Sequence, residues 1–152
     1  MKKLAILLLI CIMLTGCNKN NNLDLTRLHV EINEFCDNLK EIDSSINGIT
    51  NITTDEQGIK TATDALMNNL DLLKDEFAKF SNIDFPAEYE YLEKLADEAY
   101  DYMNEAVNAY NKTYRDNYTS SMEEYASENY KRAYKRVQII IDVLNGKEPV
   151  TQ

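Results

Sequence analysis

The sequence contains few residues that interrupt helices: two prolines and four glycines among 152 residues. Both prolines, Pro86 and Pro149, fall at the edges of segments with periodic apolar residues, and neither lies inside one. Proline inside a helix removes a backbone hydrogen bond and clashes with the preceding turn. Their placement therefore leaves room for long, unbroken helices.

Residues that commonly carry catalysis or bind metals are also scarce. His29 is the only histidine, and no glutamate stands three residues before it, which excludes the paired Glu-x-x-His motifs of a di-iron helical bundle. The chain has no HExxH, Walker, GxSxG or Cys-x-x-Cys motif. We therefore expect no enzymatic activity, no catalytic or cofactor-binding residue and no metal. His29 is expected beside the apolar stripe of its helix, at the flank or surface.

Positive charge is in deficit, with 16 Lys and Arg against 26 Asp and Glu, for a formal net charge of −10. Lys2 and Lys3 both precede the apolar run at the start of the chain, so the remainder is more acidic still. Such a domain repels phosphate backbones and anionic surfaces, which argues against nucleic acid as a partner.

The first 17 residues carry the most specific pattern in the chain. Lys2 and Lys3 precede eleven apolar residues, 4–14, and the run closes with Leu14-Thr15-Gly16-Cys17. An apolar run of this length is typical of a signal peptide, because a helix needs about 20 residues to span a bilayer. The sequence predicts a signal peptide over residues 1–16; an uncleaved anchor or an ordinary secretory signal is the alternative.

This leader resembles the processing box of bacterial lipoproteins. The resemblance implies that Cys17 receives a diacylglyceryl group, that a peptidase cuts before it and that acyl chains such as palmitate hold the protein on the extracytoplasmic face of the cell membrane. Asn18 to Asn22 are polar and aperiodic, so residues 17–23 are predicted to be the lipidated cysteine and a flexible tether. The rest of the chain is similar to small helical lipoproteins of unknown function from low-GC Gram-positive bacteria.

Four segments between residues 24 and 146 repeat apolar residues at spacings of three and four, which is the helical period. Their stripes are Leu25, Leu28, Ile32, Phe35, Leu39, Ile42 and Ile46; Ile59, Leu66, Leu70, Leu73, Phe77 and Phe80; Tyr89, Leu92, Ala96, Ala99, Met103, Ala106 and Tyr110; and Ala126, Tyr130, Ala133, Val137, Ile140 and Leu144. Short connections between long helices imply antiparallel neighbours. We predict an all-α, up-down-up-down four-helix bundle over 24–146 and a tail over 147–152; a three-helix bundle or dimerising hairpins are the alternatives.

The expected helix boundaries follow from local residue chemistry. Asn47-Gly48 and Asn145-Gly146 are helix stops, because both residue types tolerate the left-handed conformation. Thr54 and Gln57 match a capping box. The third helix is expected to open at Pro86, and residues 115–119 are expected to form the turn before a fourth helix capped by Ser120 or Ser121.

All ten tyrosines lie between Tyr89 and Tyr134. Rings with a polar handle suit a pocket for a sugar, peptide or aromatic ligand, and they equally suit the core and rim of a bundle. A pocket would be lined by a subset of Tyr89, Tyr100, Tyr110, Tyr130 and Tyr134. Tyr91 and Tyr125 fall on the outward side of the stripes, so we predict that these two contact a partner.

The single basic cluster, Lys131, Arg132, Lys135 and Arg136, is a second candidate contact. It would meet an acidic partner, a wall polymer or phospholipid, or it would instead pair with acids on its own helix or the preceding one. Glu128 stands four residues before Arg132, and the preceding segment supplies Asp97, Glu98, Asp101 and Glu105.

Cys36, the single cysteine after Cys17, lies at the edge of the first stripe and is expected to be buried and inert. The end of the last helix is apolar on nearly every side, and we expect it near the membrane or against the other helix ends. The sequence predicts a membrane-anchored, non-catalytic binding module for an envelope protein. The alternative is a small-ligand receptor with a tyrosine-lined pocket, serving uptake or sensing.

Overall fold

The structure, a computed structural model, describes residues 23–49 and 55–147. Four α-helices dominate these ranges: α1 (Leu23–Gly48), α2 (Glu56–Ser81), α3 (Glu93–Asn111) and α4 (Ser120–Leu144). A 3₁₀ turn, η2 (Glu90–Leu92), precedes α3, and a π-helical segment, η3 (Lys112–Asp116), follows it. Neither range contains a β-strand, so the all-α prediction is confirmed. The predicted leader, Cys17 and most of its tether and tail lie outside the described residues.

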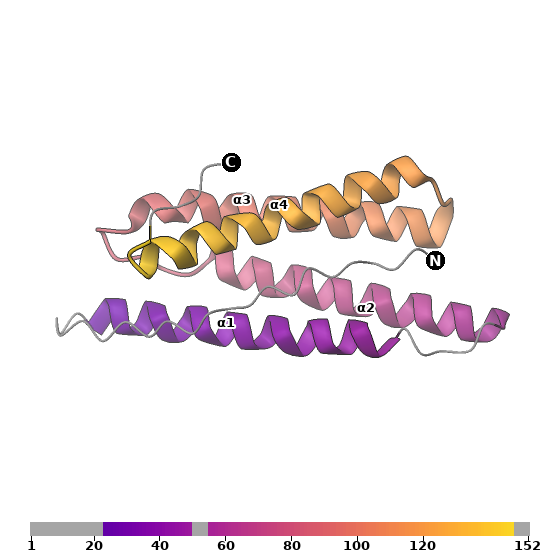
Figure 1. Cartoon of the computed structure of the whole chain (residues 1–152), viewed down its shortest axis with the longest axis horizontal. Coiled ribbons are helices and arrows are strands. Elements are labelled where there is room, and N and C mark those ends of the chain that lie inside the picture. Colours follow the sequence, from indigo (N-terminus) through magenta and orange to yellow (C-terminus); the bar gives the residue numbers. More distant parts are fainter. Residues whose placement is uncertain (1–22, 50–54, 148–152) are drawn as a thin grey trace.

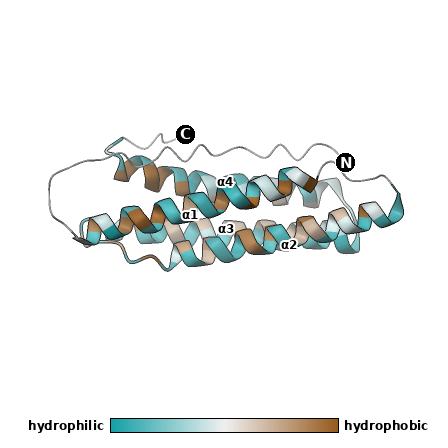
Figure 2. Ribbon diagram, turned by 90° about the horizontal axis from the view of Figure 1, so that it is seen from below, coloured by the Kyte–Doolittle hydropathy of each residue, from teal (hydrophilic) through white to brown (hydrophobic). Residues whose placement is uncertain are grey.

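Consecutive helices run in opposite directions and pack against one another (Figure 1). The predicted up-down-up-down bundle is confirmed. α1 begins at the same end of the bundle at which α4 finishes, and the α3–α4 connection lies at the opposite end (Figure 1). Seen from below, α1 lies alongside α4 (Figure 2), and a side-chain hydrogen bond between Asp43 and Tyr130 joins these two helices. The four helices therefore enclose one core.

The predicted stripes supply most of that core. Leu28, Ile32, Phe77, Met103 and Val137 are fully buried in it. Ile59 was predicted to be part of the stripe of α2, but it is 47% exposed. The first turns of α2 extend beyond the end of α1 (Figure 1), so this position has no helix opposite it on that side.

The residues that cap the N-termini of α2 and α4 are neighbours of the predicted ones. Thr54 lies outside the described residues, and Asp55 caps α2 by accepting a 2.7 Å hydrogen bond from the amide of Gly58. A carboxylate suits this position because it also meets the positive end of the helix dipole. Thr119, rather than Ser120 or Ser121, caps α4 through its hydroxyl.

The start of α3 was predicted at Pro86, but the helix begins at Glu93. Two successive turns intervene, because the amide of Tyr89 donates to the carbonyl of Pro86 and the amide of Leu92 donates to that of Tyr89. This tighter path buries both Phe85 and Leu92. The α2–α3 connection thus covers one end of the core instead of extending the helix.

Both Asn-Gly sequences end a helix as predicted. Gly146 adopts a φ of +69°, and the amide of Lys147 returns to the carbonyl of Asp142 at 2.8 Å. The last turns of α4 carry hydrophobic residues (Figure 2). None of the helices within 23–49 and 55–147 combines the length and hydropathy that crossing a membrane requires.

Candidate functional site

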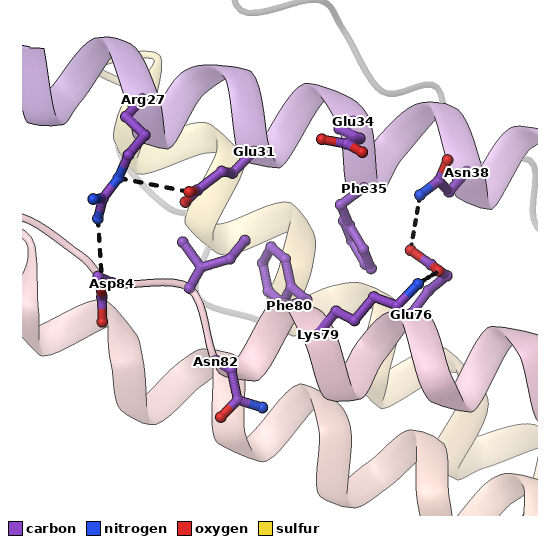
Figure 3. A pocket seen from close by; sticks show the side chains of 11 residues that line it. Arg27, Glu31, Glu34, Phe35, Asn38, Glu76, Lys79, Phe80, Asn82 and Asp84 are labelled. Atoms are coloured by element: carbon purple, nitrogen blue, oxygen red, sulfur yellow. Dashed lines mark hydrogen bonds and ion pairs between the residues drawn. The ribbon is translucent and has the colours of Figure 1, made fainter.

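A cleft of about 360 Å³ lies between α1, the second half of α2 and the start of the α2–α3 connection (Figure 3). Its walls carry four carboxylates and two cations: Glu31, Glu34, Glu76, Asp84, Arg27 and Lys79. These groups come together because α1 and α2 are antiparallel, which brings Asn38 to Glu76 and Arg27 to Asp84, pairs that are 38 and 57 positions apart in the chain. None of the cleft residues was singled out from the sequence as a site residue; Phe35 and Phe80 were predicted only as members of the apolar stripes.

Polar bridges close the two ends of this cleft. At one end the guanidinium of Arg27 lies 3.5 Å from carboxylate oxygens of both Glu31 and Asp84. At the other end the amide of Asn38 donates a 2.9 Å hydrogen bond to Glu76. The bridges join α1 to α2 and to the connection after it, although the Arg27 pairs are largely exposed and contribute little to stability.

Glu76 is the best-protected carboxylate of the cleft. Burial by itself raises its pKa, but hydrogen bonds from Lys79 and Asn38 prevail and hold the pKa below its usual value. Glu76 therefore stays ionised and already has its partners.

The floor of the cleft is apolar. The rings of Phe35 and Phe80 stack with centroids 4.3 Å apart, and Phe35 also meets Phe77 edge-on at 5.3 Å. Both floor rings are almost fully buried, so they are anchored in the core of the bundle. The cleft thus combines a rigid hydrophobic base with a charged rim.

A second feature lies at the far end of the bundle, where α3 turns into α4. The rings of Tyr110, Tyr114 and Tyr118 follow one another with centroid separations of 6.1 and 6.5 Å. The first ring is buried and the last is 61% exposed. The hydroxyls of Tyr114 and Tyr118 both donate to Glu123, at 3.0 and 2.6 Å. We call Tyr114, Tyr118 and Glu123 the tyrosine tip.

The π-helical segment η3 contributes to this arrangement. It carries Tyr114 and ends just before Tyr118, and π-helical turns occur often at functional sites. Burial, followed by the hydrogen bond to Glu123, raises the pKa of Tyr114, and that hydrogen bond is the main cause of the raised pKa of Tyr118. Both phenols therefore remain protonated donors at physiological pH.

The two tyrosines predicted to contact a partner are both exposed: 63% for Tyr91 and 49% for Tyr125. They lie apart. Tyr91 is in η2, at the end of the bundle where α1 begins, whereas Tyr125 is two residues beyond Glu123 and hydrogen-bonds Glu105 at 3.2 Å. Tyr125 thus lies at the same end of the bundle as the tyrosine tip but, two residues along the helix from Glu123, does not share its face; contact with a partner stays a prediction for both tyrosines.

The basic cluster has its own partners within the bundle. Lys131, rather than Arg132, forms the ion pair with Glu128, at 2.9 Å; the hydrogen bond from Lys131 is the main cause of the lowered pKa of Glu128, and the charge of Arg132 adds to it. The guanidinium of Arg132 instead lies over the ring of Tyr102, 5.7 Å from its centroid. A cation above an aromatic face is stabilised by the ring quadrupole.

Arg136 makes the strongest contact of this cluster. Its Nε donates to Glu98 at 2.6 Å, and its guanidinium lies 5.4 Å from the centroid of Tyr102. The expected pairing with an acid of the preceding helix therefore forms at Glu98. Lys135 lies on the exposed side of α4. Much of the positive charge of this cluster is thus neutralised locally.

A buried carboxylate was missed by sequence reasoning. Asp43 of α1 is 7% exposed, its carboxylate is hydrogen-bonded to Tyr130 and Tyr134 of α4, and its Oδ1 has no partner in the described structure. A signal existed, because Asp43 stands four residues after Leu39 and three before Ile46, which is the spacing of the stripe itself.

The tyrosines proposed as pocket lining fill the interior instead. Tyr110, Tyr130 and Tyr134 are buried, and Tyr89 and Tyr100 pack partly against the core. The cleft between α1 and α2 has no tyrosine among its lining residues. These rings therefore pack in the core of the bundle and do not line the cleft.

The two remaining candidate residues, Cys36 and His29, are buried or partly buried. Cys36 is 4% exposed, in agreement with its expected burial. His29 is partly buried, its Nε2 has no partner in the described structure, and burial lowers its pKa. Within 23–49 and 55–147, no three His, Cys, Asp or Glu side chains are placed to hold a metal ion.

Comparison with known proteins adds a family. Residues 29–142 match the family described as "Domain of unknown function (DUF7018)". No curated protein and no solved structure matches the chain. The matched range takes in most of α1 and α4 and everything between them, so it covers the tyrosine tip and every residue lining the cleft except Arg27. The chain belongs to the DUF7018 family.

Proposed function

We propose that this protein is a bacterial lipoprotein, from a low-GC Gram-positive host, anchored through lipid on Cys17 to the extracytoplasmic face of the cell membrane. Its bundle acts as a non-catalytic binding module that contacts an envelope protein through the tyrosine tip and Tyr125. The leader with its Leu14-Thr15-Gly16-Cys17 box supports the anchor. The exposed, hydrogen-bonded tyrosines at the opposite end of the bundle support the contact.

The observation that carries the binding role is the fixed position of Tyr118. Its ring is 61% exposed, yet its hydroxyl is held on Glu123 at 2.6 Å. Tyrosine is enriched among the residues that dominate protein interfaces. Holding the ring in place before binding reduces the entropy lost when a partner docks.

The arrangement of the helices supports a contact surface that lies away from the proposed anchor. α1 follows the tether and has 26 residues, which corresponds to about 39 Å at 1.5 Å per residue. The tyrosine tip lies at the other end of the bundle (Figure 1). A bundle standing on its tether would therefore present Tyr118 well beyond the reach of surface charge on the membrane, which is screened within about 8 Å.

The anchor is tested with Cys17→Ala. Palmitate labelling of the wild-type chain in its own host should disappear in this variant, and the unprocessed precursor should accumulate. Cys36→Ala is the matched control, because it removes the buried thiol and should leave labelling intact. Normal labelling of Cys17→Ala would rule out lipidation at this residue.

The contact surface is tested by photocrosslinking. A photoreactive phenylalanine analogue replaces Tyr118 or Tyr125 in the membrane-bound protein, and the same analogue at Tyr91 is the control. Tyr91 is as exposed as Tyr118 but lies at the opposite end of the bundle. Discrete crosslinked species should appear from positions 118 and 125 only. Crosslinks from position 91 alone, or equal crosslinks from all three, would contradict the proposal.

A further inference from the structure

We propose that the cleft between α1 and α2 binds a small organic cation: a primary ammonium or guanidinium group on a short apolar arm. The cleft (Figure 3) shares no residue with the tyrosine tip, so a test of this site is independent of a test of the proposed envelope-protein contact. Three properties of the cleft lead to this ligand: its charge, one carboxylate without a partner, and its apolar floor.

The charge of the cleft disfavours an anionic ligand. Four carboxylates face two cations around its rim, within a chain of net charge −10. An anion would be repelled both by the rim and by the whole protein, whereas a cation would be attracted by both. The ligand therefore carries positive charge.

Glu34 is the carboxylate that such a ligand would meet. Arg27 lies beside Glu31 and Asp84, and Glu76 is hydrogen-bonded by Lys79 and Asn38. Glu34 makes no hydrogen bond or ion pair with any described residue, although its charge helps to raise the pKa of Lys79 after the larger effect of Glu76. The other three carboxylates already pair with the ammonium of Lys79 or the guanidinium of Arg27, so Glu34, which is exposed at the rim, is the remaining acceptor for a cation.

The floor and the volume of the cleft limit the size and polarity of the part of the ligand that carries no charge. Beneath the rim lie the stacked rings of Phe35 and Phe80, with Ile83 also lining the cleft. A volume of about 360 Å³ is at the small end of ligand sites. Phe35 and Phe80 are almost fully buried and Ile83 is half-buried, so a cation with an apolar arm of a few carbon atoms, or one aromatic ring, can place its charge on Glu34 and its arm against Ile83 above these rings.

Two sources supply this chemistry: a free amine, and a lysine or arginine side chain of a polypeptide. Two probes distinguish them, benzylamine and the peptide acetyl-Ala-Lys-Ala-amide, each titrated into the ¹⁵N-labelled full chain in neutral detergent micelles. Saturable shifts of the side-chain amides of Asn38 and Asn82 should appear with at least one probe. A response to benzylamine alone assigns a free amine, and a response to the peptide assigns a polypeptide side chain.

Glu34→Gln should weaken binding of the responding probe about tenfold, because a charged hydrogen bond becomes a neutral one. The matched control is Glu41→Gln, two turns along the same face of α1, exposed and outside the cleft; it should leave binding unchanged. Benzyl alcohol, the neutral counterpart of benzylamine, should not bind. The proposal is overturned if neither probe gives a saturable shift, if benzyl alcohol binds as well as benzylamine, or if Glu41→Gln weakens binding as much as Glu34→Gln.

Discussion

Asp43 of α1 and Tyr130 of α4 meet inside the bundle, where the carboxylate of Asp43 is hydrogen-bonded to this hydroxyl and to that of Tyr134. The two hydroxyls lie 3.2 Å apart. Burial raises the pKa of Tyr130, with the charge of Asp43 as the next cause. The phenols therefore remain protonated, and the ionisable member of this cluster near neutral pH is Asp43.

Asp43 should make stability depend on pH. Burial raises the pKa of Asp43 from 3.8 to about 6, against the opposing effect of the tyrosine hydrogen bonds. The folded chain thus binds this proton more tightly than the unfolded chain, so the stabilisation is complete below about pH 4 and is lost as the pH rises through about 6. Asp43→Asn should raise the free energy of unfolding at neutral pH by about 1–2 kcal/mol, measured by urea denaturation.

The gain from Asp43→Asn should shrink towards zero below pH 4, where Asp43 is protonated in both states. Glu41→Gln, an exposed change on the same helix, should leave the difference between pH 4 and 7 as it is in the wild type. Destabilisation by Asp43→Asn at neutral pH would mean that the ionised carboxylate stabilises the seam between α1 and α4.

The tyrosine tip should depend on the charge of Glu123. Glu123→Gln replaces a carboxylate that accepts from both Tyr114 and Tyr118, and should lower stability by about 1 kcal/mol. Thermal unfolding measures the loss. Glu124→Gln is the control, because Glu124 is the exposed neighbour, and an equal effect of both changes would show that general helix charge, and not the tip, is responsible.

Two members of the basic cluster should differ in their contribution to stability. Arg136 is 24% exposed, pairs with Glu98 and lies over Tyr102, so Arg136→Ala should destabilise by about 1–2 kcal/mol. Lys131 and Glu128 are both more than half exposed, and Lys131→Ala should change stability by less than about 0.5 kcal/mol. Chemical denaturation of both variants tests this order, and the reverse order would contradict it.

The two Asn-Gly helix ends should respond oppositely to alanine. Gly146 has a φ of +69°, so Gly146→Ala should cost about 1 kcal/mol. Gly48 is the last residue of α1, without a positive φ, and an added Cβ would meet nothing within 4 Å. Gly48→Ala should therefore stabilise by about 0.5 kcal/mol. Similar melting temperatures for the two variants would show that the backbone at these positions relaxes.

The helices of this protein could be predicted because their information is local. Spacings of three and four and the two Asn-Gly pairs depend on residues within a few turns of one another. Errors arose where a neighbouring element decides the outcome. Ile59 fits its stripe but lies beyond the end of α1, and Pro86 begins a pair of turns that buries Phe85.

The cleft could not be predicted for the same reason. Glu34 and Glu76 come from different helices, and their approach depends on the relative rotation and register of α1 and α2. A single sequence fixes which face of a helix is apolar, but not which polar residues flank the seam. Asp43 could be predicted in part: the sequence shows that it lies in the apolar stripe of α1, but it does not show which residues of α4 it contacts.

The order of the helices has a consequence for folding kinetics. α1 packs on α2, α2 on α3 and α3 on α4, so much of the fold can form by successive hairpins with short loop closures. Chains dominated by such local contacts fold in microseconds to milliseconds. The seam at Asp43 and Tyr130 joins residues 87 positions apart, so its closure carries the largest entropy cost. We expect the contacts of Asp43 with α4 to form after the folding transition state, so that changes there alter the unfolding rate more than the folding rate.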